Sequence, residues 1–572
     1  MGNLPNLGRV SIPSEDTVLI PRSALRPKIL TVFRGYSREA FLNDLMAGGI
    51  VGIVALPLAI AFAIASGVSP ERGLITAVVA GFIISLLSGS RVHIGGPTGA
   101  FVVVVYAVIQ KHGLDGLMIS TFMAGGILVI MGMVGFGSLI KFIPRPVTVG
   151  FTSGIAVIIF SSQIRDLFGL RMTDVPADFF GKWSAYGHAA GSFNLIALAL
   201  AVGCGSILLF WPKISTKIPG SLIALIASTL IVLIFRLPVE TIGSRFGSIP
   251  SAIPIPKMPH LEWGMIRELV SPAFTIALLS GIESLLSATV SDGMIGGKHR
   301  SNMELVAQGV ANLVSPLFGG IPATGAIART ATNVKNGGRT PVAGIVHALT
   351  LLLIMLVLGR WAVLIPLCSL AAILIFVAYH MSEWRTFKAL LRGPRSDGIV
   401  LMTTFTLTVV VDLTVAIEVG MLLAMLLFMK HMSESMQINP LGMAMAEENE
   451  KIPEPVVWTR KQIPEGVEVF DVQGALFFGA AQRFEESIGI SGKSPRAIIV
   501  RIRDVLHIDG TGIYALEQIF HRCQKLGAEF LLAGVQPQHR IVLDKSGLTG
   551  KIGLENLLPT LEAALERFKI PR

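Results

Sequence analysis

Two glycine- and proline-containing stretches of the sequence could together bind an anion inside a membrane. GGPTGAFVVVV occupies residues 95–105, and GGIPATGAIART occupies residues 319–330. Each places two glycines and a proline before small or apolar residues, so each predicts a short helix that begins within an apolar region. The first turn of a helix carries unpartnered backbone N–H groups and the positive end of the helix dipole. Two such helix starts aimed at one point would favour a negatively charged ligand.

A simpler interpretation is that glycine and proline only kink two packed helices, since both residues are common in membrane helices. Paired breaks at matching places in two inverted halves favour a transport site instead. Irregular backbone cannot face lipid with unpaired N–H groups, so it must line a cavity or be buried in protein.

Two ionisable residues lie where such a site would need them. Glu283 is in the middle of the apolar stretch TIALLSGIESLLSATVSDG, and Ser287 shares its helix face one turn on. A carboxylate in a membrane needs a partner, a cation or a proton, so Glu283 could take up H⁺ or Na⁺ with the substrate. Arg329 lies about one turn into the second short helix, where it could hold an anion or pair with Glu283. A purely structural ion pair is the alternative for both residues.

The composition predicts an integral membrane protein. Of 572 residues, 52% are hydrophobic and only 15% are charged, whereas a soluble protein carries about a quarter charged residues. Crossing the hydrocarbon core takes about 20 apolar residues in a helix. Candidate spans lie at 44–66, 71–90, 97–112, 115–140, 146–166, 193–211, 219–236, 266–292, 303–318, 323–336, 341–359, 361–380, 397–412 and 415–430.

These fourteen segments divide into two halves of seven, about 44–236 and 266–430. Seven is an odd number, so the second half runs inverted across the membrane, and the interrupted segment is third in each half. Basic loops fall on the side of the basic N-terminus, which predicts that both termini are cytoplasmic. We therefore expect a cytoplasmic segment at 1–43 and a transport domain at 44–431.

The chain changes character after the last span. Residues 432–462 predict a polar, proline-containing linker. Residues 463–572 alternate strand-like and helix-like patterns, including a strand at 496–503 and a helix at 510–527. This alternation predicts a small soluble α/β domain.

Three motif blocks resemble the SulP (sulfate permease) family of anion transporters. The first two are PLAIAFAIASGVSPERGLITAVVAGFIISLLSGSRVHIGGPTGAF and NMELVAQGVANLVSPLFGGIPATGAIARTATNVKNGGRTP. The third, LHIDGTGIYAL, resembles a STAS domain. The resemblance implies a membrane α-helical fold of about fourteen helices in two inverted seven-helix repeats, as in nucleobase permeases. It also implies an elevator-like movement of a core domain against a gate domain, in a homodimer.

The resemblance also implies which residues face the anion. They are Phe62, Thr98, Gly99, Ala100, Phe101, Thr324, Gly325, Ala326, Ala328 and Arg329. Cation-coupled relatives have an acidic residue at the Glu283 position and often a hydroxyl at the Ser287 position, so the resemblance favours symport. If the cation is Na⁺, Glu283, Ser287 and Thr324 are its expected ligands. Thr511 takes the place of a serine that is phosphorylated in soluble STAS proteins, although a plain helix-capping role is the alternative.

We therefore expect a secondary active transporter, not an enzyme, that carries a small anion into the cytoplasm with H⁺ or Na⁺. Sulfate, bicarbonate and C4-dicarboxylates all remain open as substrates, and no other cofactor is expected. The expected location is a plasma membrane, such as a bacterial inner membrane, with protein contacts through the STAS domain and none with nucleic acid. The alternatives are an uncoupled exchanger or channel, a nucleobase–cation symporter of the same fold, and a signalling protein.

Overall fold

The computed structural model describes residues 25–32, 36–138, 143–172, 175–176, 178–214, 219–247, 254–258, 263–434, 437–440, 463–477 and 495–568. Most of the predicted N-terminal segment (1–24 and 33–35) and most of the predicted linker (435–436 and 441–462) lie outside these residues. The chain divides into two compact units, Met1–Met421 and Leu422–Arg572. Each unit is described by itself.

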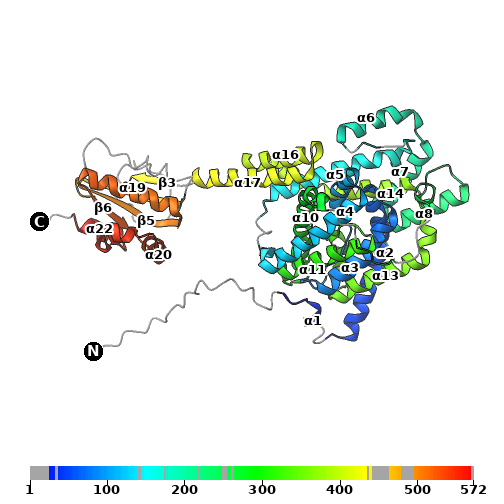
Figure 1. The fold of residues 1–572 in the computed structure, drawn as a ribbon, viewed down its shortest axis with the longest axis horizontal. Coiled ribbons are helices and arrows are strands. Elements are labelled where there is room, and N and C mark those ends of the chain that lie inside the picture. The colour runs from blue at the N-terminus through cyan, green and yellow to red at the C-terminus, as the bar shows by residue number, and fades with distance from the viewer. Residues whose placement is uncertain are drawn as a thin grey trace. The chain divides into compact units, whose positions relative to one another are not determined.

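Every predicted span contains a helix (Figure 1). The helices are α2 (Arg38–Ala65), α3 (Pro70–Leu87), α4 (Ala100–Val134), α5 (Arg145–Phe168), α7 (Leu195–Phe210), α8 (Gly220–Phe235), α10 (Trp263–Ile295), α11 (Ser301–Val314), α12 (Ile327–Lys335), α13 (Pro341–Ala362), α14 (Leu367–Met381), α16 (Arg395–Val410) and α17 (Leu413–Glu434). The helix α4 accounts for two spans, because Gly113 has a non-helical backbone with φ of 67°. The break falls between the spans predicted at 97–112 and 115–140.

Among the described residues of the helical unit, four short α-helices lie outside the predicted spans: α1 (Ile29–Val32), α6 (Phe179–Ala189), α9 (Ile242–Phe246) and α15 (Trp384–Leu391). The helix α6 begins at an Asp178 cap, whose carboxylate accepts the Gly181 N–H at 2.6 Å. Such a cap satisfies one of the backbone donors that open a helix. Phe179 and Lys182 of this helix line a cavity.

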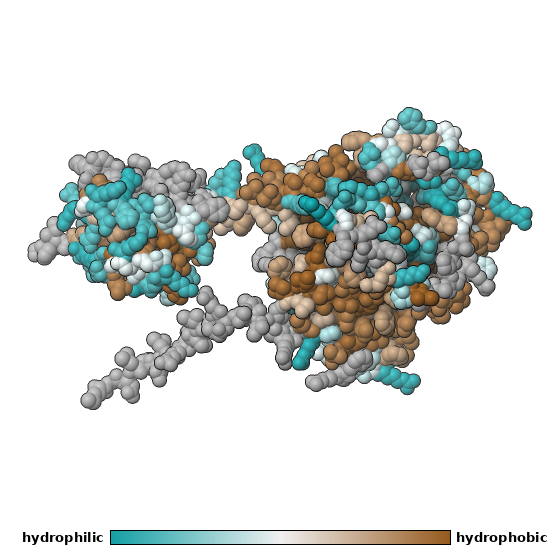
Figure 2. Space-filling model, viewed as in Figure 1, coloured by the Kyte–Doolittle hydropathy of each residue, from teal (hydrophilic) through white to brown (hydrophobic). Residues whose placement is uncertain are grey.

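The helical unit presents apolar side chains outward, as a protein in lipid must. Among the described residues, eight helices are long and apolar enough to cross a membrane. Leucine and phenylalanine side chains are exposed on several of them, including Leu209 of α7 at 63% and Phe428 of α17 at 64%. Figure 2 shows this apolar surface over the helical unit. The shorter α11 and α12 carry buried polar residues instead, because they pack inside the bundle.

The helices of this unit form two groups. In one group α4 packs against α10 and α11, while α13 packs against α2 and α3. In the other, α5 packs against α14 and α16, and α7 packs against α8 and α14. Small residues bring helices close in the first group: a Cβ on Gly125 would lie 2.7 Å from the Gly309 carbonyl oxygen. Such contacts are the usual basis of helix packing in membranes.

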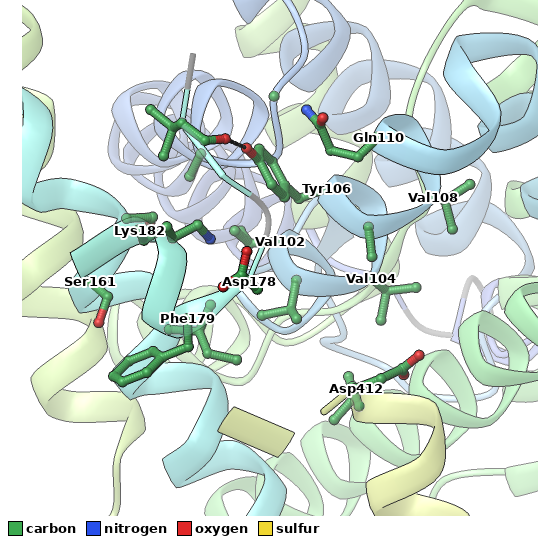
Figure 3. A pocket seen from close by; sticks show the side chains of 18 of the residues that line it. Val102, Val104, Tyr106, Val108, Gln110, Ser161, Asp178, Phe179, Lys182 and Asp412 are labelled. Carbon is green, nitrogen blue, oxygen red and sulfur yellow. Dashed lines mark hydrogen bonds between the residues drawn. The ribbon is translucent and has the colours of Figure 1, made fainter. Parts of the chain in front are cut away.

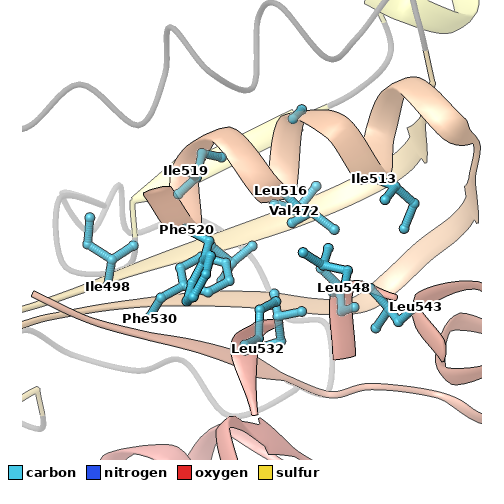
Figure 4. Close-up of a cluster of buried hydrophobic side chains, with 14 of the residues drawn as sticks. Val472, Ile498, Ile513, Leu516, Ile519, Phe520, Phe530, Leu532, Leu543 and Leu548 are labelled. Carbon is cyan, nitrogen blue, oxygen red and sulfur yellow. The ribbon is translucent and has the colours of Figure 1, made fainter. Parts of the chain in front are cut away.

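The second unit contains a five-stranded sheet in the order β3-β4-β5-β6-β7. Its strands are β3 (Gln437–Pro440), β4 (Val467–Leu476), β5 (Ala497–Ile508), β6 (Glu529–Ala533) and β7 (Leu557–Leu558), and only β3 is antiparallel to its neighbour. The helix α19 (Gly510–Leu526) packs Leu516 and Phe520 onto the sheet (Figure 4). Because β3 joins this sheet, the predicted linker at 432–462 contains one of its strands.

Candidate functional site

The two interrupted segments meet in the structure. The strand β1 (Gly95–Gly96) pairs antiparallel with β2 (Thr324–Gly325), with Gly95 opposite Gly325 and Gly96 opposite Thr324. The Ala326 N–H extends the ladder by donating to the Ile94 carbonyl at 2.8 Å. These bonds satisfy irregular backbone that would be costly in lipid. The helix α4 begins at Ala100, and α12 begins at Ile327, four residues after the start of the span predicted at 323–336.

The helix α10 holds this two-strand ladder from one side. The Ser284 hydroxyl accepts the Gly325 N–H at 2.9 Å and lies 2.8 Å from the Thr324 hydroxyl oxygen. The Thr324 hydroxyl also donates to the Ser280 carbonyl at 2.9 Å. All three side chains are buried. The hydroxyl of Thr324 is therefore committed to α10, and the first turn of α12 is fixed relative to that helix.

Glu283 is joined to the first repeat. Its Oε2 accepts the Thr98 hydroxyl at 3.0 Å, which links α10 to the start of α4. Both residues are half-buried. Among the described residues no ion pair forms between Glu283 and Arg329, so the empty-site pairing considered from the sequence is not the arrangement found. In the described part of the chain, Glu283 therefore has a hydroxyl donor and no ion-pair partner.

Arg329 crosses from the second repeat to the first. Its Nη2 donates to the Pro97 carbonyl at 2.5 Å, and the residue is 2% exposed. Its Nη1 has no hydrogen-bond partner among the described residues. Gly96 leaves room for the guanidinium: with φ of 150°, a Cβ there would lie 2.4 Å from Nη1. A buried cation thus stands beside the starts of both short helices.

Most of the other predicted anion-facing residues gather at the same place. A Cβ on Gly99 would lie 3.2 Å from the Phe62 ring, so α2 contacts the start of α4. Ala100, Phe101 and Ala326 are buried there. Ala328 differs, because its side chain is exposed on α12.

Ser287 supports the ladder rather than contacting Glu283. Its hydroxyl donates to the Thr330 hydroxyl oxygen at 3.3 Å, and that oxygen also accepts the Ile94 N–H at 3.1 Å. Ser287, Thr330 and Ile94 are all buried. The expected cation-coupling role of Ser287 stays a prediction.

A buried Glu304–His93 pair supports the site and was not identified from the sequence. The Glu304 carboxylate on α11 lies 2.6 Å from His93 Nδ1, and both side chains are fully buried. Glu304 also accepts the Ser88 hydroxyl at 2.6 Å and the Gly89 N–H at 3.0 Å. The His93 ring lies directly against Gly325. The sequence feature that could have identified this pair is the carboxylate of Glu304, which lies within the apolar span 303–318.

This contact predicts that Gly325→Ala destabilises the protein. The added Cβ would lie 1.8 Å from His93 Nε2, and the ring cannot retreat because Glu304 holds it. Overpacking of this kind costs about 1–3 kcal/mol, so we expect a lower thermal unfolding midpoint for the purified protein in detergent. The matched control is Gly126→Ala on α4, where a Cβ meets nothing within 4 Å. Equal midpoints for the two variants would contradict the prediction.

A cavity of about 970 Å³ lies between the two helix groups, where α2 and α5 end and α10 begins. Val102 and Val103 line it, one turn from the start of α4, but Thr98 and Arg329 do not. Figure 3 shows Tyr106 and Gln110 of α4 facing it, with Lys182, Asp178 and Asp412 around them. The cavity thus approaches the predicted site from one end of the bundle.

Thr511 lies in the second unit, exposed in the first turn of α19. Asp509 caps that helix by accepting the Gly512 N–H at 2.8 Å. The cap position is therefore taken by Asp509 rather than Thr511. Phosphorylation of Thr511 stays a prediction.

Comparison with known proteins gives two family matches. The sequence model of the sulfate permease family matches residues 41–404, and that of the STAS domain matches residues 459–564. A Bacillus subtilis protein named "Putative sulfate transporter YvdB" is 43% identical over 92% of this chain and 97% of its own length. "Bicarbonate transporter BicA" of Picosynechococcus sp. is 30% identical over 92% of this chain and 94% of its own length.

Solved structures show the same architecture. A structure of SLC26A9 superposes with a TM-score of 0.84 at 18% identity and covers 95% of this chain and 92% of that one. The transmembrane domain of BicA superposes with a TM-score of 0.60 at 29% identity, covering 68% of this chain and 98% of that one. The membrane-helical fold with a C-terminal STAS domain is therefore confirmed.

Proposed function

The chain belongs to the sulfate permease family of anion transporters, and from this premise we propose that it carries a small oxyanion, with sulfate and bicarbonate as the first candidates. Its relatives are named as transporters of these anions rather than as enzymes. The single observation that supports the proposal most is the β1–β2 ladder, which sets two helix starts and the Arg329 guanidinium side by side. Helix starts and a buried guanidinium both favour negative charge.

We propose cation-coupled symport into the cytoplasm. The support is Glu283, a half-buried carboxylate whose partner is the Thr98 hydroxyl on the opposite repeat. Binding of H⁺ or Na⁺ at Glu283 would neutralise it next to the anion, so that both charges enter the same site. Ser287 and Thr324 are the further oxygen ligands proposed for Na⁺.

The movement that we propose is an elevator-like sliding of one helix group against the other. The ladder ties the predicted anion site to α2, α4 and α10 of the first group, and to α12, which packs against α10 and α2. In the proposed topology both termini are cytoplasmic, in a bacterial inner membrane, and the cavity opens to the outside. A homodimer and cytoplasmic contacts of the STAS domain complete the proposal.

The test is a substrate panel with purified protein in proteoliposomes, run under separate pH and sodium gradients. We expect concentrative uptake of sulfate or bicarbonate with one gradient and none without it. Anion flux that depends on neither the pH gradient nor the sodium gradient would indicate an uncoupled exchanger or channel. Uptake of a C4-dicarboxylate or of uracil in place of both oxyanions would reject the proposed substrates.

A further inference from the structure

The cavity between the helix groups contains a buried amine that forms no ion pair among the described residues. Lys182 on α6 is 5% exposed and lines this cavity together with Tyr106 and Gln110. Its Nζ lies 4.8 Å from the centroid of the Tyr106 ring. Among the described residues, no carboxylate oxygen lies within 4 Å of it. Burial lowers the pKa of Lys182 from its usual value, while the charge of Asp178 acts in the opposite direction.

The carboxylates that line the cavity already have partners. Asp166 forms a two-pronged ion pair with Arg245, at 2.7 and 3.2 Å. Asp178 caps α6, and Asp412 accepts the Thr414 N–H at 2.5 Å at the start of α17. The fourth, Glu268, lies 3.7 Å from His112 Nδ1.

A second cation of the cavity also lacks an ion pair, whereas Arg245 is held by Asp166. Arg165 on α5 shares the cavity with Lys182, and its buried Nε has no hydrogen-bond partner among the described residues. Arg165 also forms no ion pair within the described part of the chain. Within the described part of the chain, Lys182 and Arg165 thus line the cavity without an ion-pair partner, and a bound anion would supply one.

The cavity reaches the first turn of α4, which begins at Ala100, because Val102 lines it. Tyr106 lines it one turn further along α4, and its hydroxyl donates to the Val175 carbonyl at 2.9 Å. Figure 3 shows Lys182, Tyr106 and Val102 around the same space. An anion beside Lys182 would therefore lie on the way to the start of α4.

We propose that Lys182, assisted by Arg165, forms a second anion site that captures the transported oxyanion before it reaches the helix starts. This inference rests on the proposed function, because the captured ligand is the transported sulfate or bicarbonate. Its physical basis is electrostatic: positively charged side chains in a cavity with low-dielectric walls raise the local anion concentration and the rate of anion association. Lys182 acts before the central site and leaves the coupling at Glu283 unchanged.

The test measures anion uptake by intact cells that express the full chain, comparing wild type with Lys182→Gln. We expect Vmax/KM to fall about tenfold, at the low end of electrostatic capture effects, mainly through a higher KM. Its dependence on ionic strength should also become shallower, which a purely structural role would not produce. The control is Lys213→Gln, because Lys213 likewise lies 5.4 Å from an aromatic ring, that of Phe210, but lines no part of this cavity.

A second variant separates charge from packing. In Lys182→Cys, a reagent that attaches an aminoethyl group should restore Vmax/KM, and one that attaches a neutral group should not; the native cysteines are all buried. Unchanged Vmax/KM and salt dependence in Lys182→Gln, or equal rescue by both reagents, would overturn the second site while the proposed function stands. If the wild type carries neither anion in these cells, the proposed function fails, and this inference fails with it.

Discussion

Glu283→Gln is expected to keep anion exchange and to abolish gradient-driven accumulation. The amide oxygen of glutamine can still accept the Thr98 hydroxyl, whose oxygen lies 3.0 Å from the carboxylate, so the local geometry survives. The change removes only the charge and the ability to take up H⁺ or Na⁺. A tenfold cation gradient corresponds to about 1.4 kcal/mol, enough for about tenfold accumulation with one cation per anion. The variant should accumulate none.

The measurement compares two assays in proteoliposomes: net uptake under a cation gradient, and counterflow exchange with the anion on both sides. The control is Glu418→Gln on α17, because Glu418 is an exposed carboxylate on an apolar helix away from the site. Accumulation by Glu283→Gln that still followed the imposed gradient would remove Glu283 from the coupling role. If a folded Glu283→Gln variant showed neither net uptake nor counterflow exchange, Glu283 would have a role in anion binding instead.

Arg329→Ala is expected to weaken anion affinity by about thirtyfold or more. Removing one partner of a buried charged hydrogen bond costs about 2 kcal/mol or more, which corresponds to this factor. Arg329 is the buried cation beside both helix starts, and its Nη1 has no partner in the described structure. The anion affinity of Arg329→Lys should lie between those of the wild type and Arg329→Ala. Lysine keeps the positive charge but lacks the planar guanidinium group.

Arg329 also stabilises the fold through its hydrogen bond to Pro97, so the control variant should remove a similar hydrogen bond. Arg72 on α3 donates to the Gly319 carbonyl at 2.8 Å, across the repeats, as Arg329 does to Pro97. Arg72→Ala should therefore lower thermal stability without changing the anion dissociation constant. An unchanged dissociation constant in folded Arg329→Ala would locate the anion elsewhere.

The predictable part of the fold follows from the demands of the bilayer. Apolar runs of sufficient length predicted the spans, and glycine with proline predicted the late helix starts after Gly95 and Gly319. The meeting of those two stretches followed from their matching positions in inverted repeats. The helix α6 carried no comparable signal, since it is short and lies outside the spans, so Lys182 was not identified.

Hydrogen-bond partners could not be predicted, because they depend on atomic positions. The opposite charges of Glu283 and Arg329 suggested a pair, yet each bonds to the first repeat, at Thr98 and Pro97. Ser287 shares a helix face with Glu283, but its hydroxyl contacts Thr330. Spacing along a helix identifies which side chains share a face, and the packing of the neighbouring segment decides which bonds form.

The pairing of β1 with β2 has a consequence for biosynthesis. The bond between the Ile94 N–H and Thr330 joins residues 236 positions apart, so it forms only after the ribosome has made the second half. Until then, backbone donors and acceptors around Gly95 have no strand to pair with, and hydrocarbon cannot satisfy them. In the newly inserted first half, this backbone must therefore be hydrogen-bonded by water, by the translocon or by another protein until the second half is made. Protection of Ile94 from hydrogen exchange in nascent chains should appear only once Thr330 has emerged.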